Sequence, residues 1–328
     1  MAQQAEGQIL FTAPGQAEYR TLDLPFTPLG PQEVAGHTLV SLISTGTELA
    51  GYQGLGQWGA FPLTPGYAAV FTVEETGQEV SDLRPGDLAF CMGRHRSYQR
   101  MPRAEVIPLP ARLSPEEATF ARLMSVTLTT LITTKARPPD KVLVTGLGLV
   151  GHLAAKNFAR CGYTVYACDP DPARRAIAQA NGISHVLPAV PLDDPALAKQ
   201  VALALECSGH EQALLDACNI VRKRGEVVQV AAAWRRQTDI PAHEIQRAVF
   251  FNYVDYRSGW EWELPHHAGD FRPHSIFGNL TTALQWLAEG SVRVAGLYAM
   301  AEPQDAQQVY QKLLHGQVER LGVVLDWR

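Results

Sequence analysis

The chain has few of the features that support a disulfide framework, a structural metal or a membrane anchor. It contains five cysteines in 328 residues, and no two of them form a C-x-x-C pair. An odd number of scattered cysteines argues against paired disulfides and against a thiolate metal site, and is typical of a reducing compartment. No apolar run approaches the roughly 20 residues that a helix needs to cross a bilayer.

Basic residues are also too few for a polyanion partner. The 28 Lys and Arg residues are outnumbered by 33 Asp and Glu residues, which gives a net charge of −5 and a pI near 6.1. Nucleic-acid binding needs clustered positive charge, so no nucleic-acid partner is expected. The amino-terminal residues lack the basic segment followed by an apolar stretch that marks a signal peptide. We therefore expect a cytoplasmic protein without a membrane or nucleic-acid partner.

What the sequence does contain are two different patterns of apolar residues. In the first 110 residues, short apolar segments such as 34–43 and 68–73 are separated by Gly and Pro turns, which predicts a small barrel or sandwich. From about 118 to 260, strand-like and helix-like segments alternate, which predicts a parallel sheet covered on both faces. The expected strands of that sheet are 141–145, 164–168, 201–207, 226–230 and 248–254.

The alternating region begins with a glycine motif. The apolar strand 141–145 leads into Gly146-Leu147-Gly148-Leu149-Val150-Gly151, and a helix is expected from Val150. In a dinucleotide site the first glycine allows a tight turn, the second lets the backbone approach a pyrophosphate, and the third lets the helix pack on the strand. The pyrophosphate then faces the unpaired N–H groups of the helix N-terminus.

An acid follows at the end of the next expected strand. Asp169 lies eighteen residues after Gly151, where a carboxylate can accept hydrogen bonds from the ribose hydroxyls of the adenosine. A negative charge there would repel a 2′-phosphate, so NAD(H) is favoured over NADP(H). Arg174 and Arg175 follow closely enough to weaken that preference. The alternative is an unrelated glycine-rich turn, with Asp169 capping the next helix.

Further short motifs occur in order along the chain. They are Ile43-Ser44-Thr45-Gly46-Thr47-Glu48, Leu63-Thr64-Pro65-Gly66-Tyr67, Arg84-Pro85-Gly86-Asp87, Leu205-Glu206-Cys207-Ser208-Gly209 and Arg224-Gly225-Glu226-Val227-Val228. Together with the glycine motif they make the whole chain resemble the medium-chain dehydrogenase/reductase family. The resemblance implies a GroES-like barrel of residues 1–121 and 261–328, a Rossmann domain of residues 122–260, and a homodimer joined through strands near 250–254.

The resemblance also implies a set of cofactor-binding residues, and it raises the question of zinc. The cofactor set is Gly146, Gly148, Leu149, Val150, Gly151, Asp169, Arg174, Cys207, Ser208 and Ala231. Zinc-dependent members bind the metal through cysteine and histidine, but this chain has Thr45 and Tyr67 at those positions. Threonine and tyrosine are poor zinc ligands, so no catalytic zinc is expected. A structural zinc would require four cysteines after Asp87, where Cys91 stands alone, so none is expected there either. A separate metal site formed by Glu48 and His95 stays as an alternative.

Without zinc, side chains must stabilise the reacting oxygen and move one proton. Thr47 matches the hydroxyl residue that starts the family's proton relay, Tyr67 can donate its phenol proton, and His95 can act as acid or base near neutral pH. Glu48 completes the candidate catalytic set. Three of the four also have a plainer interpretation: Tyr67 fills the space that zinc leaves, His95 lies in a surface loop, and Glu48 pairs with an arginine.

Three functions fit these features. The first is a zinc-independent oxidoreductase that transfers hydride between NAD(H) and a small alcohol or carbonyl compound such as a sugar or polyol. The second is an enoyl or quinone reductase; the relatives with that activity usually prefer NADPH, and Asp169 argues against it. The third is a dinucleotide-binding protein without catalysis.

Overall fold

The chain separates into two compact units in the computed structural model, which describes residues 3–25, 27–56 and 60–328. Unit 1 comprises residues 1–122, 283–290 and 294–328, and unit 2 comprises residues 123–282 and 291–293. Within the described ranges, no helix has both the length and the apolar character that a membrane crossing requires.

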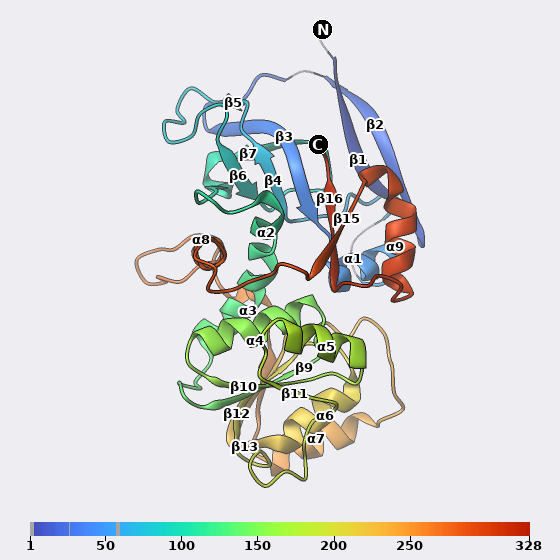
Figure 1. Cartoon of the computed structure of the whole chain (residues 1–328), viewed down its shortest axis with the longest axis vertical. Helices are drawn as coiled ribbons and strands as arrows, with labels where there is room; N and C mark the ends of the chain where they lie inside the picture. Colours follow the sequence, from blue (N-terminus) through green and yellow to red (C-terminus); the bar gives the residue numbers. More distant parts are fainter. Residues whose placement is uncertain (1–2, 26, 57–59) are drawn as a thin grey trace. The chain divides into compact units, whose positions relative to one another are not determined.

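Unit 1 is built mainly from β-strands (Figure 1). Its strands are β1 (Gln3–Ala13), β2 (Gln16–Pro25), β3 (Glu33–Leu42), β4 (Ala69–Thr72), β5 (Glu75–Thr76), β6 (Leu88–Cys91), β7 (Tyr98–Pro102), β8 (Val106–Pro108), β15 (Tyr298–Ala301) and β16 (Gly322–Asp326). Its helices are α1 (Thr45–Tyr52), α2 (Pro115–Ala118) and α9 (Ala306–Leu314). β1 and β2 form an antiparallel hairpin, and the other strands form one sheet in the order β15-β16-β3-β4-β6-β8, with β5 and β7 paired to β3.

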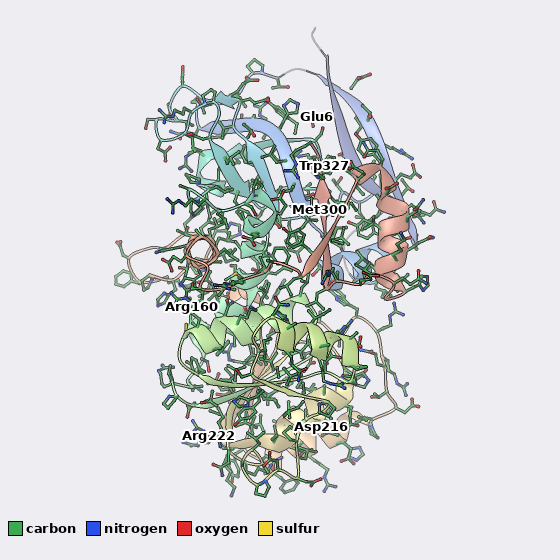
Figure 2. The ribbon with its side chains drawn as sticks, viewed as in Figure 1. Glu6, Arg160, Asp216, Arg222, Met300 and Trp327 are labelled. Carbon is green, nitrogen blue, oxygen red and sulfur yellow. The ribbon has the colours of Figure 1, made fainter. Side chains whose placement is uncertain are left out.

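Strand β3 organises this sheet, because β4, β5, β7 and β16 all pair with it. Trp327, which follows β16, lies in unit 1 (Figure 2), and its indole Nε1 donates a hydrogen bond to Ser41 Oγ of β3 at 2.8 Å. The segment after β3 was expected as a turn but forms helix α1. The side chain of Glu48 accepts a hydrogen bond from the N-cap residue's backbone, Ser44 N–H, at 2.8 Å, which stabilises the first turn of α1.

Unit 2 contains a six-stranded sheet in which every pair is parallel, in the order β11-β10-β9-β12-β13-β14. Its strands are β9 (Lys141–Thr145), β10 (Thr164–Cys168), β11 (His185–Leu187), β12 (Val201–Glu206), β13 (Val221–Gln229) and β14 (Asp255–Ser258). Its helices are α4 (Leu149–Arg160), α5 (Pro172–Ala180), α6 (Glu211–Ile220) and α7 (Ala242–Phe251), with most of α3 (Ala121–Thr133) and part of α8 (Ile276–Ala288).

Both faces of this sheet are covered, as the alternating sequence pattern predicts. Val142 and Val144 of β9 pack with α4 and α5, whereas Leu143 between them packs with α6 and α7. Figure 1 shows these two helix pairs on opposite faces of the sheet. The predicted fold class, a Rossmann sheet with a GroES-like barrel, is confirmed.

One predicted strand is wrong. Residues 248–254 do not form the last strand of the sheet: residues up to Phe251 belong to helix α7, and the edge strand is β14. A short apolar run cannot be assigned to a strand or a helix by periodicity alone. Here Ala248 packs against α6, while Phe250 and Phe251 are exposed. The residues expected to pair two protomers, 250–254, therefore form the end of α7 and the turn after it rather than a strand, and the homodimer stays a prediction.

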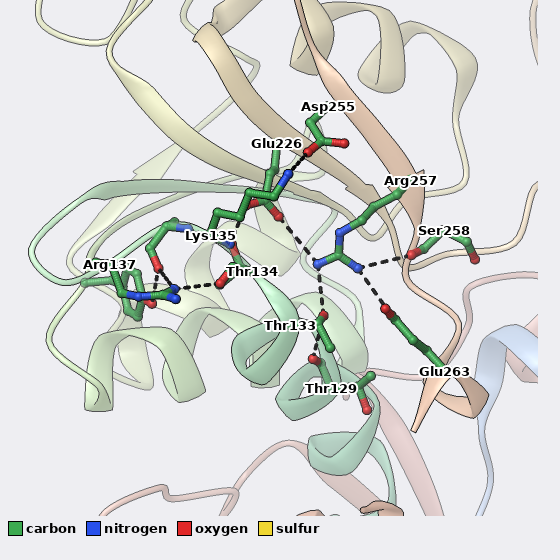
Figure 3. A network of polar contacts seen from close by, with 12 residues as sticks. Thr129, Thr133, Thr134, Lys135, Arg137, Glu226, Asp255, Arg257, Ser258 and Glu263 are labelled. Atoms are coloured by element: carbon green, nitrogen blue, oxygen red, sulfur yellow. Dashed lines mark hydrogen bonds and ion pairs between the residues drawn. The ribbon is translucent and has the colours of Figure 1, made fainter. Parts of the chain in front are cut away.

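A polar network joins the edge of this sheet to the end of α3 (Figure 3). Arg257 on β14 donates to Thr133 Oγ1 at 2.9 Å and lies 3.5 Å from the buried carboxylate of Glu226 and 3.4 Å from Glu263. Glu226 also accepts the backbone N–H of Lys135 at 2.5 Å. The contact with Glu263 helps to explain why residues 261–282, which we expected in the barrel domain, cluster with unit 2.

Candidate functional site

The predicted cofactor residues gather in unit 2 where its parallel strands end. Gly146 follows β9 directly and has a positive φ of 83°. A Cβ on Gly151 would lie 1.8 Å from the carbonyl oxygen of Gly146, so no other residue fits at Gly151. Two of the three motif glycines are therefore required by the fold itself.

Gly148 is the exception. It is the N-cap residue of α4, its φ of −64° suits any residue, and a Cβ built there would meet no atom within 4 Å. The fold does not require glycine at this position. The space beside the backbone lies at the N-terminus of a twelve-residue helix, where N–H groups without helical partners attract anions. Because glycine has no side chain, a phosphate group has room to approach the backbone closely at this position.

Asp169 lies beside the glycine turn, one residue after β10. Its buried carboxylate accepts hydrogen bonds from the N–H groups of Leu147 at 2.7 Å and Asp171 at 2.9 Å. The half-exposed Arg174 lies 3.5 Å from the same carboxylate, and Arg175 donates to the Asp169 carbonyl at 2.8 Å. The Asp169 carboxylate thus stabilises the glycine turn, and the guanidinium of Arg174 lies close to that carboxylate.

The ends of β12 and β13 complete this edge of the sheet. Glu206 is buried and accepts hydrogen bonds from Ser208 N–H at 2.7 Å, from Gly209 N–H at 3.0 Å and from the Ser208 hydroxyl. Burial raises the pKa of Glu206, and these donors oppose the shift. The Ala231 N–H donates to the Glu206 carbonyl at 3.0 Å. Glu206 was not among the predicted site residues, although it lies at a strand end as Asp169 does.

Cys207 is placed at this edge as well, but its thiol is unsuited to nucleophilic chemistry. Burial raises its pKa well above the ordinary value, so the thiolate is scarcely populated near neutral pH. Leu149 and Val150 form the first turn of α4. All ten predicted cofactor residues therefore lie on the glycine turn, the start of α4 or α5, or the ends of β10, β12 and β13.

The four predicted catalytic residues lie in unit 1, and contacts link them. His95 has no solvent exposure: its Nδ1 lies 2.7 Å from Ser41 Oγ and its Nε2 lies 2.9 Å from Glu48 Oε2. Tyr310 of α9 donates its hydroxyl to the same Glu48 oxygen at 2.5 Å. Both ring nitrogens of His95 and the Glu48 carboxylate therefore have hydrogen-bond partners within the cluster.

Tyr67 and Thr47 form the more accessible part of this cluster. The hydroxyl of Tyr67 donates to Ser44 Oγ, and the Thr47 hydroxyl also interacts with the phenol. Burial raises the pKa of Tyr67, and the nearby guanidinium of Arg122 counteracts that shift. The guanidinium carbon of Arg122 lies 4.6 Å from the centre of the Tyr67 ring. Arg122 was not predicted as a site residue, because no motif in the sequence marks it.

The donor atoms in this cluster are a poor set for zinc. Thr45 and Tyr67 offer hydroxyls, and among residues 3–25, 27–56 and 60–328 no three His, Cys, Asp or Glu side chains gather as a metal would require. Glu48 and His95 were paired in the sequence analysis as an alternative metal site. They do meet, but the imidazole Nε2 and the carboxylate oxygen face each other at hydrogen-bond distance. The polar atoms of both side chains are hydrogen-bonded to other protein groups.

Comparison with known proteins finds a family match within unit 2 and similar dehydrogenases over most of the chain. The family described as Zinc-binding dehydrogenase matches residues 146–257, beginning at the first glycine of the turn. An alcohol dehydrogenase of Geobacillus stearothermophilus is 24% identical over 298 residues, which cover 78% of this chain and 81% of that protein.

Three solved structures match nearly the whole chain. Galactitol-1-phosphate dehydrogenase from Escherichia coli has a TM-score of 0.82 at 17% identity and covers 98% of this chain and 99% of its own. A putative zinc-binding dehydrogenase from Sinorhizobium meliloti, bound to NADP, has a TM-score of 0.80 at 16% identity, with the same coverage. Acetophenone reductase from Geotrichum candidum, in complex with NAD, has a TM-score of 0.80 at 16% identity, and the match covers 99% of this chain and 98% of that protein. At these identities the likeness establishes the fold.

Proposed function

We propose that the chain is a member of the medium-chain dehydrogenase/reductase family and acts as a zinc-independent, NAD(H)-linked oxidoreductase on a small alcohol or carbonyl compound. The observation that carries the proposal is the glycine turn, in which the buried carboxylate of Asp169 contacts the backbone N–H of Leu147 at 2.7 Å. A sugar or polyol remains the substrate class that we favour, and the cytoplasm the compartment.

The residues of unit 2 fit a nicotinamide dinucleotide. The first N–H groups of α4 and the open space at Gly148 suit a pyrophosphate, and the Asp169 carboxylate suits ribose hydroxyls. When bound, the cofactor supplies hydride transfer to or from the substrate carbon. Arg174 lies near enough to Asp169 to offset part of its charge, so the preference for NAD over NADP depends on the balance between these two side chains.

Zinc does not fit the corresponding part of unit 1. The relevant positions carry the hydroxyls of Thr45 and Tyr67, and a dication would have to bind beside the guanidinium of Arg122. We therefore assign the proton to side chains. In the reductive direction the Tyr67 phenol donates to the carbonyl oxygen of the substrate, and the hydroxyls of Ser44 and Thr47 return a proton to the phenolate.

The structure changes the role that we propose for His95. A side chain without solvent exposure, with both ring nitrogens engaged, is badly placed to exchange a proton with a substrate. We now assign His95 and Glu48 to the support of α1, which carries Thr47. Glu48 binds the N-cap backbone of that helix, and His95 holds Glu48.

The activity is tested by following the absorbance of reduced nicotinamide with a panel of sugars, polyols and aldehydes. We expect turnover that neither zinc nor a chelator changes. Tyr67→Phe, which removes the hydroxyl and keeps the ring, should lower kcat by about 10²- to 10⁴-fold, while the exposed Tyr253→Phe serves as the control. Tight NADH binding without turnover would instead favour the non-catalytic dinucleotide-binding protein. Loss of activity on chelation would contradict zinc independence.

Cofactor choice is tested at Asp169. We expect Asp169→Asn to reduce the preference for NAD over NADP by about tenfold, roughly 1.4 kcal/mol, because the charge that repels a 2′-phosphate is lost. Affinity for both cofactors should also fall, since Leu147 N–H loses a charged acceptor. The exposed Asp193→Asn controls for the change in net charge. Dissociation constants measured by NADH and NADPH fluorescence decide the point, and an unchanged ratio would show that Asp169 does not contact the ribose.

A further inference from the structure

A buried arginine lies against the tyrosine that we propose as proton donor. Arg122 is 3% exposed, although guanidinium groups are normally solvated and costly to bury. It is the second residue of α3, and its guanidinium carbon lies 4.6 Å from the centre of the Tyr67 ring. This distance is that of a cation–π contact, in which the electron-rich face of the ring stabilises the cation.

The same contact would also stabilise the phenolate that forms when Tyr67 loses its proton. A positive charge within 4–6 Å favours the ionised form of an acid. Around Tyr67 the hydroxyls of Ser44 and Thr47 also favour the phenolate, whereas burial and the carboxylate of Glu48 disfavour it. Of the groups that lower the pKa of Tyr67, Arg122 has the largest effect.

We propose that Arg122 is a positioning residue that provides the fixed positive charge on which proton transfer by Tyr67 depends. The proposal rests on the function proposed above. In the reductive direction the O–H bond of Tyr67 breaks as the substrate oxygen, made negative by hydride addition, takes the proton. The phenolate is then reprotonated through Ser44 or Thr47 from water, and oxidation of the alcohol follows the same steps in reverse. Throughout, Arg122 keeps its proton and stabilises the phenolate.

The inference is tested by measuring the ionisation of Tyr67 alone. A fluorinated tyrosine is incorporated at position 67 of the full chain, and its ¹⁹F resonance is followed against pH without cofactor or substrate. We expect Arg122→Met to raise the pKa of this phenol by about one unit or more. Arg122→Lys should recover at least half of the shift, because it retains the charge, and the exposed Arg84→Met should leave the pKa unchanged.

Two results would overturn the proposal: an unchanged pKa in Arg122→Met, or a pKa in Arg122→Lys that matches the methionine variant. If Arg122→Met does not fold, Arg122→Gln is titrated in its place, with the same rise expected. Because the titration requires no turnover, its result is independent of the activity panel. An active enzyme with an unshifted phenol would refute the role of Arg122 alone, and a shifted phenol in an inactive protein would refute only the proposed function.

Discussion

Gly148→Ala is expected to leave unit 2 folded and to weaken dinucleotide binding by about 100-fold, roughly 2.7 kcal/mol. The added methyl group meets no protein atom within 4 Å, and the backbone there has an ordinary φ, so the folded chain accommodates it. Replacing glycine by alanine at an N-cap position costs only about 1 kcal/mol or less. The same methyl group occupies the space through which a pyrophosphate would approach the start of α4.

The measurement is NADH fluorescence for the affinity, with thermal unfolding of the unliganded protein for the fold. Gly269→Ala is the matched control, because it also adds a methyl group in open space but lies outside the glycine turn. Gly151→Ala provides the contrast: its methyl group would lie 1.8 Å from the Gly146 carbonyl, so it should damage the fold itself. If Gly148→Ala binds NADH as tightly as the unmodified chain, the pyrophosphate does not lie at this helix end.

His95→Leu should destabilise unit 1 by about 1 to 3 kcal/mol, the usual cost of leaving a buried polar group without one of its hydrogen-bond partners. Glu48 keeps Tyr310 and the Ser44 N–H but loses the imidazole at 2.9 Å, and the side chains of Glu48, His95 and Tyr310 are buried. Since Glu48 holds the first turn of α1, the position of Thr47 should be disturbed as well.

The chain offers a matched control for this variant. His37 also contacts a glutamate, Glu74, at 2.7 Å, but both side chains are about half exposed. His37→Leu should change the free energy of unfolding by less than about 1 kcal/mol, because solvent screens exposed pairs. Urea unfolding followed by tryptophan fluorescence compares the two variants. Equal destabilisation would mean that the buried network contributes no more than a surface pair.

The parts of the fold that the sequence predicted correctly are those with local causes. Residues 141–169 form strand, glycine turn, helix and strand in succession, and each residue type there meets a steric or electrostatic requirement of its neighbours. Ser114 likewise caps α2, accepting the N–H of Glu117 at 3.2 Å, as its sequence context suggests. Local signals failed at 248–254, because four consecutive apolar residues suit a helix as well as a strand, and the packing on α6 decided between them.

The candidate catalytic cluster shows the opposite case. The sequence named Thr47, Glu48, Tyr67 and His95 from separate motifs, but it contained no signal that Ser41, Tyr310 and Trp327 would bind them together. Trp327 and Ser41 are 286 positions apart, and Tyr310 and Glu48 are 262 apart. Arg122 was not predicted, because its proposed role depends on its contact with the Tyr67 ring, and no sequence motif near Arg122 indicates that contact.

By itself, then, the sequence determined a dinucleotide-type turn with an acid at the next strand end, and the absence of zinc-type ligands at the family's positions. Both depend on residue identity at fixed spacing, where sterics and charge act over a few residues. Only the tertiary structure showed that His95 is fully buried with both ring nitrogens in contact with protein atoms, that nothing in the fold requires glycine at position 148, and that a guanidinium lies against Tyr67. Burial and long-range contact are set by how distant strands and helices pack, which local pattern does not specify.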